Sequence, residues 1–69
     1  MQVVIETRTV GQNFATVGIV RYRRRDGRPG RKLAEANHLR PYGFDASARA
    51  DAEALAARRG WTVADDSVS

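Results

Sequence analysis

The spacing of apolar positions near the start of the chain predicts two strands. Val3 and Ile5 share one face of the β-branched segment 2–8, and β-branched residues favour extended structure. A longer strand is expected over residues 14–24. Glycine and asparagine in the intervening segment 10–13 tolerate a positive φ, so the two strands are predicted to pair as an antiparallel hairpin.

The second predicted strand has two faces, because residues two positions apart share a side. One face carries Ala15, Val17, Ile19, Arg21 and Arg23, and the other carries Phe14, Thr16, Gly18, Val20, Tyr22 and Arg24. Neither face is purely apolar, so the strand is expected to start inside the protein and to extend past the core at its basic end. Gly18 in mid-strand indicates a bulge or a close backbone approach.

A turn and a segment of ambiguous structure follow. Asp26-Gly27 is a strong hairpin signal, and Pro29-Gly30 is predicted to reinforce it. Residues 31–39 fit either a third strand or a helix. The strand is favoured, because a short glycine-flanked turn joins this segment to the preceding strand.

The clearest helical pattern covers residues 46–59. Asp45 or Ser47 is expected to cap its start, and Gly60 is expected to end it. Trp61, the largest apolar residue, is expected to close the core from a short final strand. The buried side of the helix is predicted to consist of Ala50, Ala54, Leu55 and Ala57, with Ala48 and Ala52 at its margin.

These elements predict an α+β fold: a three-stranded antiparallel sheet packed by one C-terminal helix, in the order β-β-β-α with a short final strand. The 69 residues make one domain at most. That domain is expected over residues 1–64, followed by a flexible acidic tail at residues 65–69.

Composition removes several ways of stabilising so small a core. The chain has no cysteine, so it has no disulfide and no thiolate zinc site, and its single histidine, His38, cannot build a histidine metal site. We expect no metal and no cofactor, and we expect stability to come from compact packing, from a partner or from a homodimer. The apolar runs are too short to span a membrane, and the first residues lack the features of a signal peptide. No membrane association and a cytoplasmic location are therefore expected.

Charge is concentrated in the middle of the chain. Residues 21–40 hold eight basic and two acidic residues, and nucleic acid is the commonest partner of such a patch. Arginine outnumbers lysine eleven to one. A genome rich in G and C produces that preference, but it does not explain the clustering. The predicted binding residues are Arg21, Tyr22, Arg23, Arg24, Arg25, Arg28, Arg31 and Lys32.

A hairpin that carries these side chains has the width to enter the major groove of duplex DNA. Its guanidinium groups are suited to phosphates and to guanine edges. Two alternatives stay open at this point. The basic face or the sheet edge could dock on an acidic protein, as in a small accessory or inhibitor protein, or the hairpin tip could be a solvated surface.

Three features of the sequence point to a known family. They are the turn sequence Tyr-Arg-Arg-Arg-Asp-Gly at residues 22–27, the basic strand expected after it, and Gly43-Phe44-Asp45 before the alanine-rich helix. Over residues 14–60 the chain resembles the arm-site-binding domains at the N-terminus of tyrosine recombinases and the related AP2-type domains. The resemblance implies that a sheet face docks in the DNA major groove while the helix packs behind the sheet. It assigns DNA contacts to Arg21, Arg23, Arg25, Arg31 and Lys32.

Catalysis is not expected. His38 has no serine, cysteine or paired carboxylate near it in the sequence, and the glycines form no phosphate-binding motif. The sequence therefore predicts a small non-catalytic DNA-binding protein that uses a basic β-hairpin.

Overall fold

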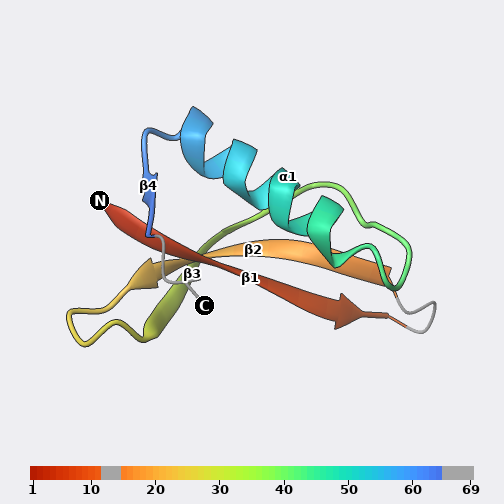
Figure 1. Ribbon diagram of the computed structural model, residues 1–69, viewed down its shortest axis with the longest axis horizontal. Helices are drawn as coiled ribbons and strands as arrows, with labels where there is room; N and C mark the ends of the chain where they lie inside the picture. The colour runs from red at the N-terminus through yellow and green to blue at the C-terminus, as the bar shows by residue number, and fades with distance from the viewer. Residues whose placement is uncertain (12–14, 65–69) are drawn as a thin grey trace.

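A computed structural model describes residues 1–11 and 15–64 of the chain (Figure 1). Its elements are β1 (Gln2–Val10), β2 (Ala15–Arg23), β3 (Pro29–Glu35), α1 (Asp45–Arg58) and β4 (Thr62–Val63). The predicted turn at residues 12–13, the predicted strand start at Phe14 and the predicted tail at 65–69 lie outside the described residues. The order β-β-β-α with a short last strand confirms the predicted α+β fold.

One sheet of four strands forms one layer, and α1 lies across one of its faces (Figure 1). The strand order is β3-β2-β1-β4. The neighbours β1, β2 and β3 run antiparallel, whereas β4 runs parallel to β1. Residues 31–35 thus belong to a strand, as favoured from the sequence, and the strand ends at Glu35, before residue 39.

The pairing of β1 with β2 is regular, and the pairing of β2 with β3 is not. The β1–β2 register is unbroken from Val3↔Tyr22 to Val10↔Ala15. On the other side, the β2–β3 register shifts twice between Val20 and Arg23. Each shift places one extra residue in β3, which increases the local twist of the hairpin.

Gly18 fixes which face of the sheet meets the helix. A Cβ atom on Gly18 would overlap the carbonyl oxygen of Ala48 and lie 2.8 Å from the Cβ of Ala52. Even-numbered residues of β2 therefore face α1, and odd-numbered residues point away from it. The predicted close backbone approach at Gly18 is confirmed, and the alternative, a bulge at Gly18, is not what the structure shows, because the pairing of β1 with β2 is regular there and the extra residues lie in β3.

The helix buries a stripe of three alanines, of which the sequence analysis placed two, Ala48 and Ala52, only at the margin of the buried side and missed the third, Ala56. Ala48, Ala52 and Ala56 are fully buried. Ala50, Ala54 and Ala57, which were predicted to be buried, are exposed, and Leu55 is half-buried. The buried alanines are four residues apart, which places them on one face of the helix. They pack against Gly18 and Val20, because their small side chains let the two backbones approach.

The two ends of α1 differ in how well they were predicted. The N-cap is Phe44 without a side-chain cap, so the predicted capping by Asp45 or Ser47 is wrong. Asp45 lies inside the first turn, where its negative charge interacts favourably with the positive end of the helix dipole. At the C-terminus Gly60 has φ 77°, and its N–H donates to the Ala57 carbonyl oxygen at 3.1 Å, as predicted for the residue that ends the helix.

One core cluster lies between the sheet and α1, and Val17 and Ile19 of β2 are also fully buried, although they lie on the other face of the strand. The centre of the cluster is Val3, Val20, Ala52 and Ala56, and Ile5, Leu33, Leu55 and Trp61 pack around it. Trp61 therefore contributes to closing the core, as predicted. In the described part of the chain, α1 is the only helix, and it is too short and too polar to cross a bilayer.

Candidate nucleic-acid interface

The basic segment forms the tip of the β2–β3 hairpin. The Gly27 N–H donates to the Arg24 carbonyl oxygen at 2.9 Å, and the Arg24 N–H donates to the Arg28 carbonyl oxygen at 2.9 Å. Gly27 has φ 87°, as required in a three-residue hairpin loop that closes with a left-handed residue. The Asp26 carboxylate accepts the Arg28 N–H at 3.0 Å. The local sequence thus builds a rigid turn.

Pro29 and Gly30 do not belong to this turn, so their predicted role is wrong. They are the first two residues of β3, where an edge strand tolerates proline at its start. Gly30 serves the hairpin differently: a Cβ there would lie 3.2 Å from the Tyr22 ring. The absence of a side chain at this position lets Tyr22 lie across β3.

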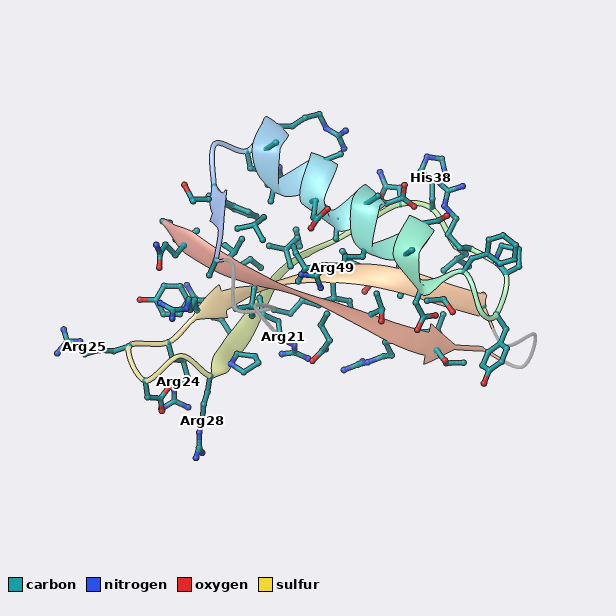
Figure 2. All side chains as sticks on the ribbon, in the orientation of Figure 1. Arg21, Arg24, Arg25, Arg28, His38 and Arg49 are labelled. Atoms are coloured by element: carbon teal, nitrogen blue, oxygen red, sulfur yellow. The ribbon has the colours of Figure 1, made fainter. Side chains whose placement is uncertain are left out.

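Three arginines surround the turn and extend into solvent. Arg24, Arg25 and Arg28 are exposed, and Arg25 and Arg28 point away from the body of the molecule (Figure 2). We call these three residues the tip cluster. Within residues 1–11 and 15–64, their guanidinium groups have no hydrogen-bond or ion-pair partner.

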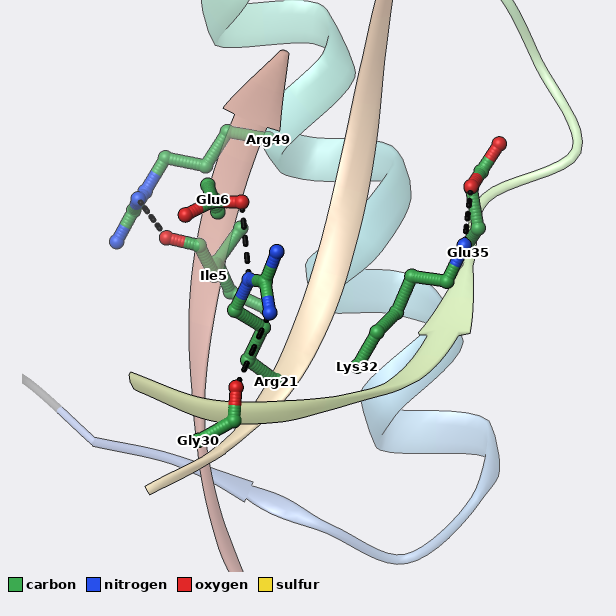
Figure 3. A network of polar contacts seen from close by, with 7 residues as sticks. All are labelled: Ile5, Glu6, Arg21, Gly30, Lys32, Glu35 and Arg49. Carbon is green, nitrogen blue, oxygen red and sulfur yellow. Dashed lines mark hydrogen bonds and ion pairs between the residues drawn. The ribbon is translucent and has the colours of Figure 1, made fainter. Parts of the chain in front are cut away.

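Arg21 links the base of the hairpin to β1. Its Nε donates to Glu6 Oε1 at 3.0 Å, and its Nη1 donates to the Gly30 carbonyl oxygen at 3.1 Å (Figure 3). The Arg21 side chain is only 21% exposed. The structure therefore gives Arg21 a bracing role, and its predicted contact with DNA would use whatever part of the guanidinium stays accessible.

The other predicted residues divide between the base and the flank of the hairpin. Arg23 donates from Nη1 to Gln2 Oε1 at 3.1 Å, and Lys32 is 3.0 Å from Glu35 Oε1 in an exposed ion pair. Exposed pairs of this kind are weak, so Lys32 stays available to an anion. Arg31 is exposed on β3.

A shallow groove that the sequence reasoning missed lies on the α1 side of the hairpin. Tyr22, 43% exposed, and Met1 supply its apolar surface. Arg24 and Arg31 flank it. The strand period already put Tyr22 and Arg24 on one face, but Arg31 joins them because of the irregular β3 register, which the sequence does not reveal.

His38 is exposed and lies beside the ion pair between Arg40 and Asp51. The carboxylate of Asp51 accepts two hydrogen bonds from Arg40, both 2.8 Å. Those bonds lower the pKa of Asp51 while burial raises it, and the charges of Arg40 and His38 lower it further. Over the described residues, no three histidine or acidic side chains come together as a metal site.

Comparison with known protein families, with curated proteins and with solved structures finds no match for this chain. The resemblance to arm-site-binding domains therefore stays a prediction.

Proposed function

We propose that this protein binds duplex DNA without catalysis, through the tip cluster at the end of its β2–β3 hairpin. The observation that carries the proposal is the grouping of Arg24, Arg25 and Arg28 around a rigid turn, exposed and without partners in the described part of the chain. Three guanidinium groups in so small a space repel one another. An approaching row of phosphates relieves that repulsion and supplies bidentate acceptors.

The shape of the hairpin supports the same partner. The hairpin extends beyond the part of the sheet that α1 covers (Figure 1), so its tip can approach a large ligand without obstruction from the helix. A two-stranded ribbon fits the major groove. Arg21 and its bonds to Glu6 and Gly30 hold the base of this ribbon in place, which reduces the entropy lost on binding.

The proposal assigns the phosphate contacts to the tip and a secondary role to the flank. Arg31 and Lys32 extend the positive surface along β3, and Tyr22 offers a hydroxyl and a ring beside them. Contacts to phosphates position a protein on DNA but do not select a sequence. We therefore expect salt-sensitive binding with little preference among duplex sequences.

The salt dependence of DNA binding tests this function. A fluorescently labelled duplex is titrated with protein at several salt concentrations, and anisotropy gives the dissociation constant. The variant Arg25→Ala/Arg28→Ala removes two tip charges. Each lost phosphate contact lowers the slope of log K against log salt by about 0.9, so we expect the slope to fall by nearly two.

The matched control is Arg58→Ala/Arg59→Ala, which removes the same charge at the exposed end of α1. We expect this control to keep most of the wild-type slope. Equal losses in the two variants would mean that overall charge, not the tip cluster, attracts the DNA. No binding of duplex at low salt would exclude the proposed function and would favour an acidic protein as the partner of the tip.

A further inference from the structure

Among the residues that the structure describes, 1–11 and 15–64, no strand pairs with the outer edge of β1 beyond its first residues. The N–H groups of Thr62 and Ala64 donate to the carbonyl oxygens of Met1 at 3.0 Å and Val3 at 2.8 Å. The odd-numbered backbone groups of β1 therefore point toward β4, away from β2. Since β4 pairs only with Gln2 and Val3, the backbone groups of Thr7 and Thr9 face outward beyond the end of β4.

This edge has little to keep another strand away. Among the described residues, the hydrogen bond made to this edge beyond β4 is a long one, 3.4 Å from Arg49 Nη1 to the Ile5 carbonyl oxygen (Figure 3). Arg49 also lies 3.5 Å from Glu53, so it keeps an ionic partner if it leaves Ile5. From Val3 to Val10 the strand has no proline and no bulge, which are two of the devices that protect an edge.

The side chains along this edge are complementary to themselves. The face of β1 that points away from α1 carries, in order along the strand, Val4, Glu6, Arg8 and Val10. If a second β1 pairs antiparallel with Thr7 opposite Thr7, then Glu6 faces Arg8 and Val4 faces Val10, each twice. Opposite charges across a strand pair stabilise it, and like charges destabilise it.

We infer that β1 is the interface of a symmetric homodimer, in which two copies pair their β1 strands about a two-fold axis at Thr7. The outward groups of Thr7 exchange hydrogen bonds with their own counterparts, and Ile5 pairs with Thr9 of the second copy. This arrangement uses the seven residues from Val4 to Val10. It stops where the pairing with β4 begins, so β4 does not have to move.

Charge selects this register over its neighbours. A shift of the second copy by two residues in one direction places Glu6 opposite Glu6, and the opposite shift places Arg8 opposite Arg8. Arg8 has no partner among the described residues, so it is free to meet Glu6. The second carboxylate oxygen of Glu6 is available, since Arg21 bonds Oε1 and the side chain is 37% exposed.

The association state of charge variants tests the interface. Light scattering coupled to size exclusion is expected to show a dimer for the wild type. Arg8→Glu places Glu6 opposite a glutamate at both ends of the seam, and we expect a monomer. The control Arg58→Glu makes the same change of net charge at the exposed C-terminal end of α1 and is expected to stay dimeric. Circular dichroism verifies that each variant is folded.

A cysteine variant tests the register in a chain that has no native cysteine. Thr7→Cys places two thiols beside the two-fold axis, so mild oxidation is expected to give a disulfide-linked dimer. Thr9→Cys, which faces Ile5 of the other copy, is expected to cross-link poorly. A monomeric wild type at high concentration would overturn the inference, and so would a folded Arg8→Glu variant that stays dimeric. DNA binding is not the readout, so these results stand apart from those for the tip cluster.

Discussion

Gly18 shows how one residue position controls the approach of α1 to the sheet. Its backbone φ is not in the left-handed region, so its role is spatial: there is no room for a Cβ between β2 and the backbone of Ala48. The sequence indicates this close approach only in part, through a glycine at a strand position that would normally carry a side chain. The identity of the opposing residue depends on the rotation of the helix, which the sequence left undetermined.

Replacing Gly18 by alanine should destabilise the protein severely. The new methyl group overlaps the Ala48 carbonyl oxygen, and overpacking of this kind costs about 1–3 kcal/mol, or more where backbone must move. Urea unfolding measures the loss. Gly43→Ala is the control: it meets nothing within 4 Å and has φ 93°, so it carries only the strain of about 1–2 kcal/mol for a left-handed residue. Equal losses at the two positions would contradict the close approach.

The Arg40–Asp51 pair ties the crossover between β3 and α1 to the helix. Asp51 is 16% exposed and Arg40 is 39% exposed, and their bidentate contact also raises the pKa of Arg40. Because the pKa of Asp51 is lower in the folded protein than in the unfolded chain, the pair stabilises the fold at pH values above about 4, the pKa of an unperturbed aspartate. That contribution disappears as the pH falls through the folded-state pKa.

The variant Asp51→Asn makes this pH dependence measurable. We expect it to be less stable than the wild type at neutral pH, and we expect the difference to shrink steadily as the pH is lowered below about 4. Urea midpoints recorded for both proteins across that range provide the measurement. A difference that stays constant with pH would show that the loss comes from packing and not from the charge of Asp51.

At the level of the element, α1 illustrates why an alanine-rich helix conceals its buried face. Ala48, Ala52 and Ala56 lie against the sheet, whereas Ala50, Ala54 and Ala57 face solvent. Alanine occupies both sides, so apolar periodicity carries little information about orientation. The existence and limits of the helix were predictable from its composition and from Gly60. Its rotation was not, because Gly18 and Val20 determine it from another part of the chain.

A pair of leucine substitutions tests that rotation. Ala52→Leu inserts a large side chain between α1 and Val20 and should lower the free energy of unfolding by about 1–3 kcal/mol. Ala54→Leu lies on the exposed side and should change it by less than about 0.5 kcal/mol. Chemical denaturation of the two variants gives the comparison. A larger loss of stability for Ala54→Leu than for Ala52→Leu would contradict the observed rotation of α1, because it would mean that the face with Ala54 packs on the sheet.

The β2–β3 hairpin shows the same division between local and distant causes. Asp26 and Gly27 predicted the turn, because its geometry depends on residues adjacent in the chain. The two register shifts in β3 were not predictable. Leu33 of β3 packs against the core, Gly30 lies beside Tyr22, and the shifts bring Arg31 to the same groove as Tyr22.

At the scale of the whole molecule, the basic middle of the sequence becomes two regions with different roles. Arg21 and Arg23 lie at the base of the hairpin and bond to residues of β1, Glu6 and Gln2, whereas the tip cluster extends into solvent. Counting charges along the sequence predicted the location of the candidate site. It did not separate bracing arginines from exposed ones, because the partners lie 15 and 21 positions away in the chain.

The irregular β3 edge determines how far an assembly of this protein can grow. A sheet with two regular open edges can add copies at both sides and extend into a fibril. Here Pro29 and the two register shifts make β3 an irregular template on one side, and within the described part of the chain only β1 offers a continuous one. Two β1 strands that pair with each other leave no such template at either end of the combined sheet, so the association is self-limiting and concentration alone should not drive it toward aggregates.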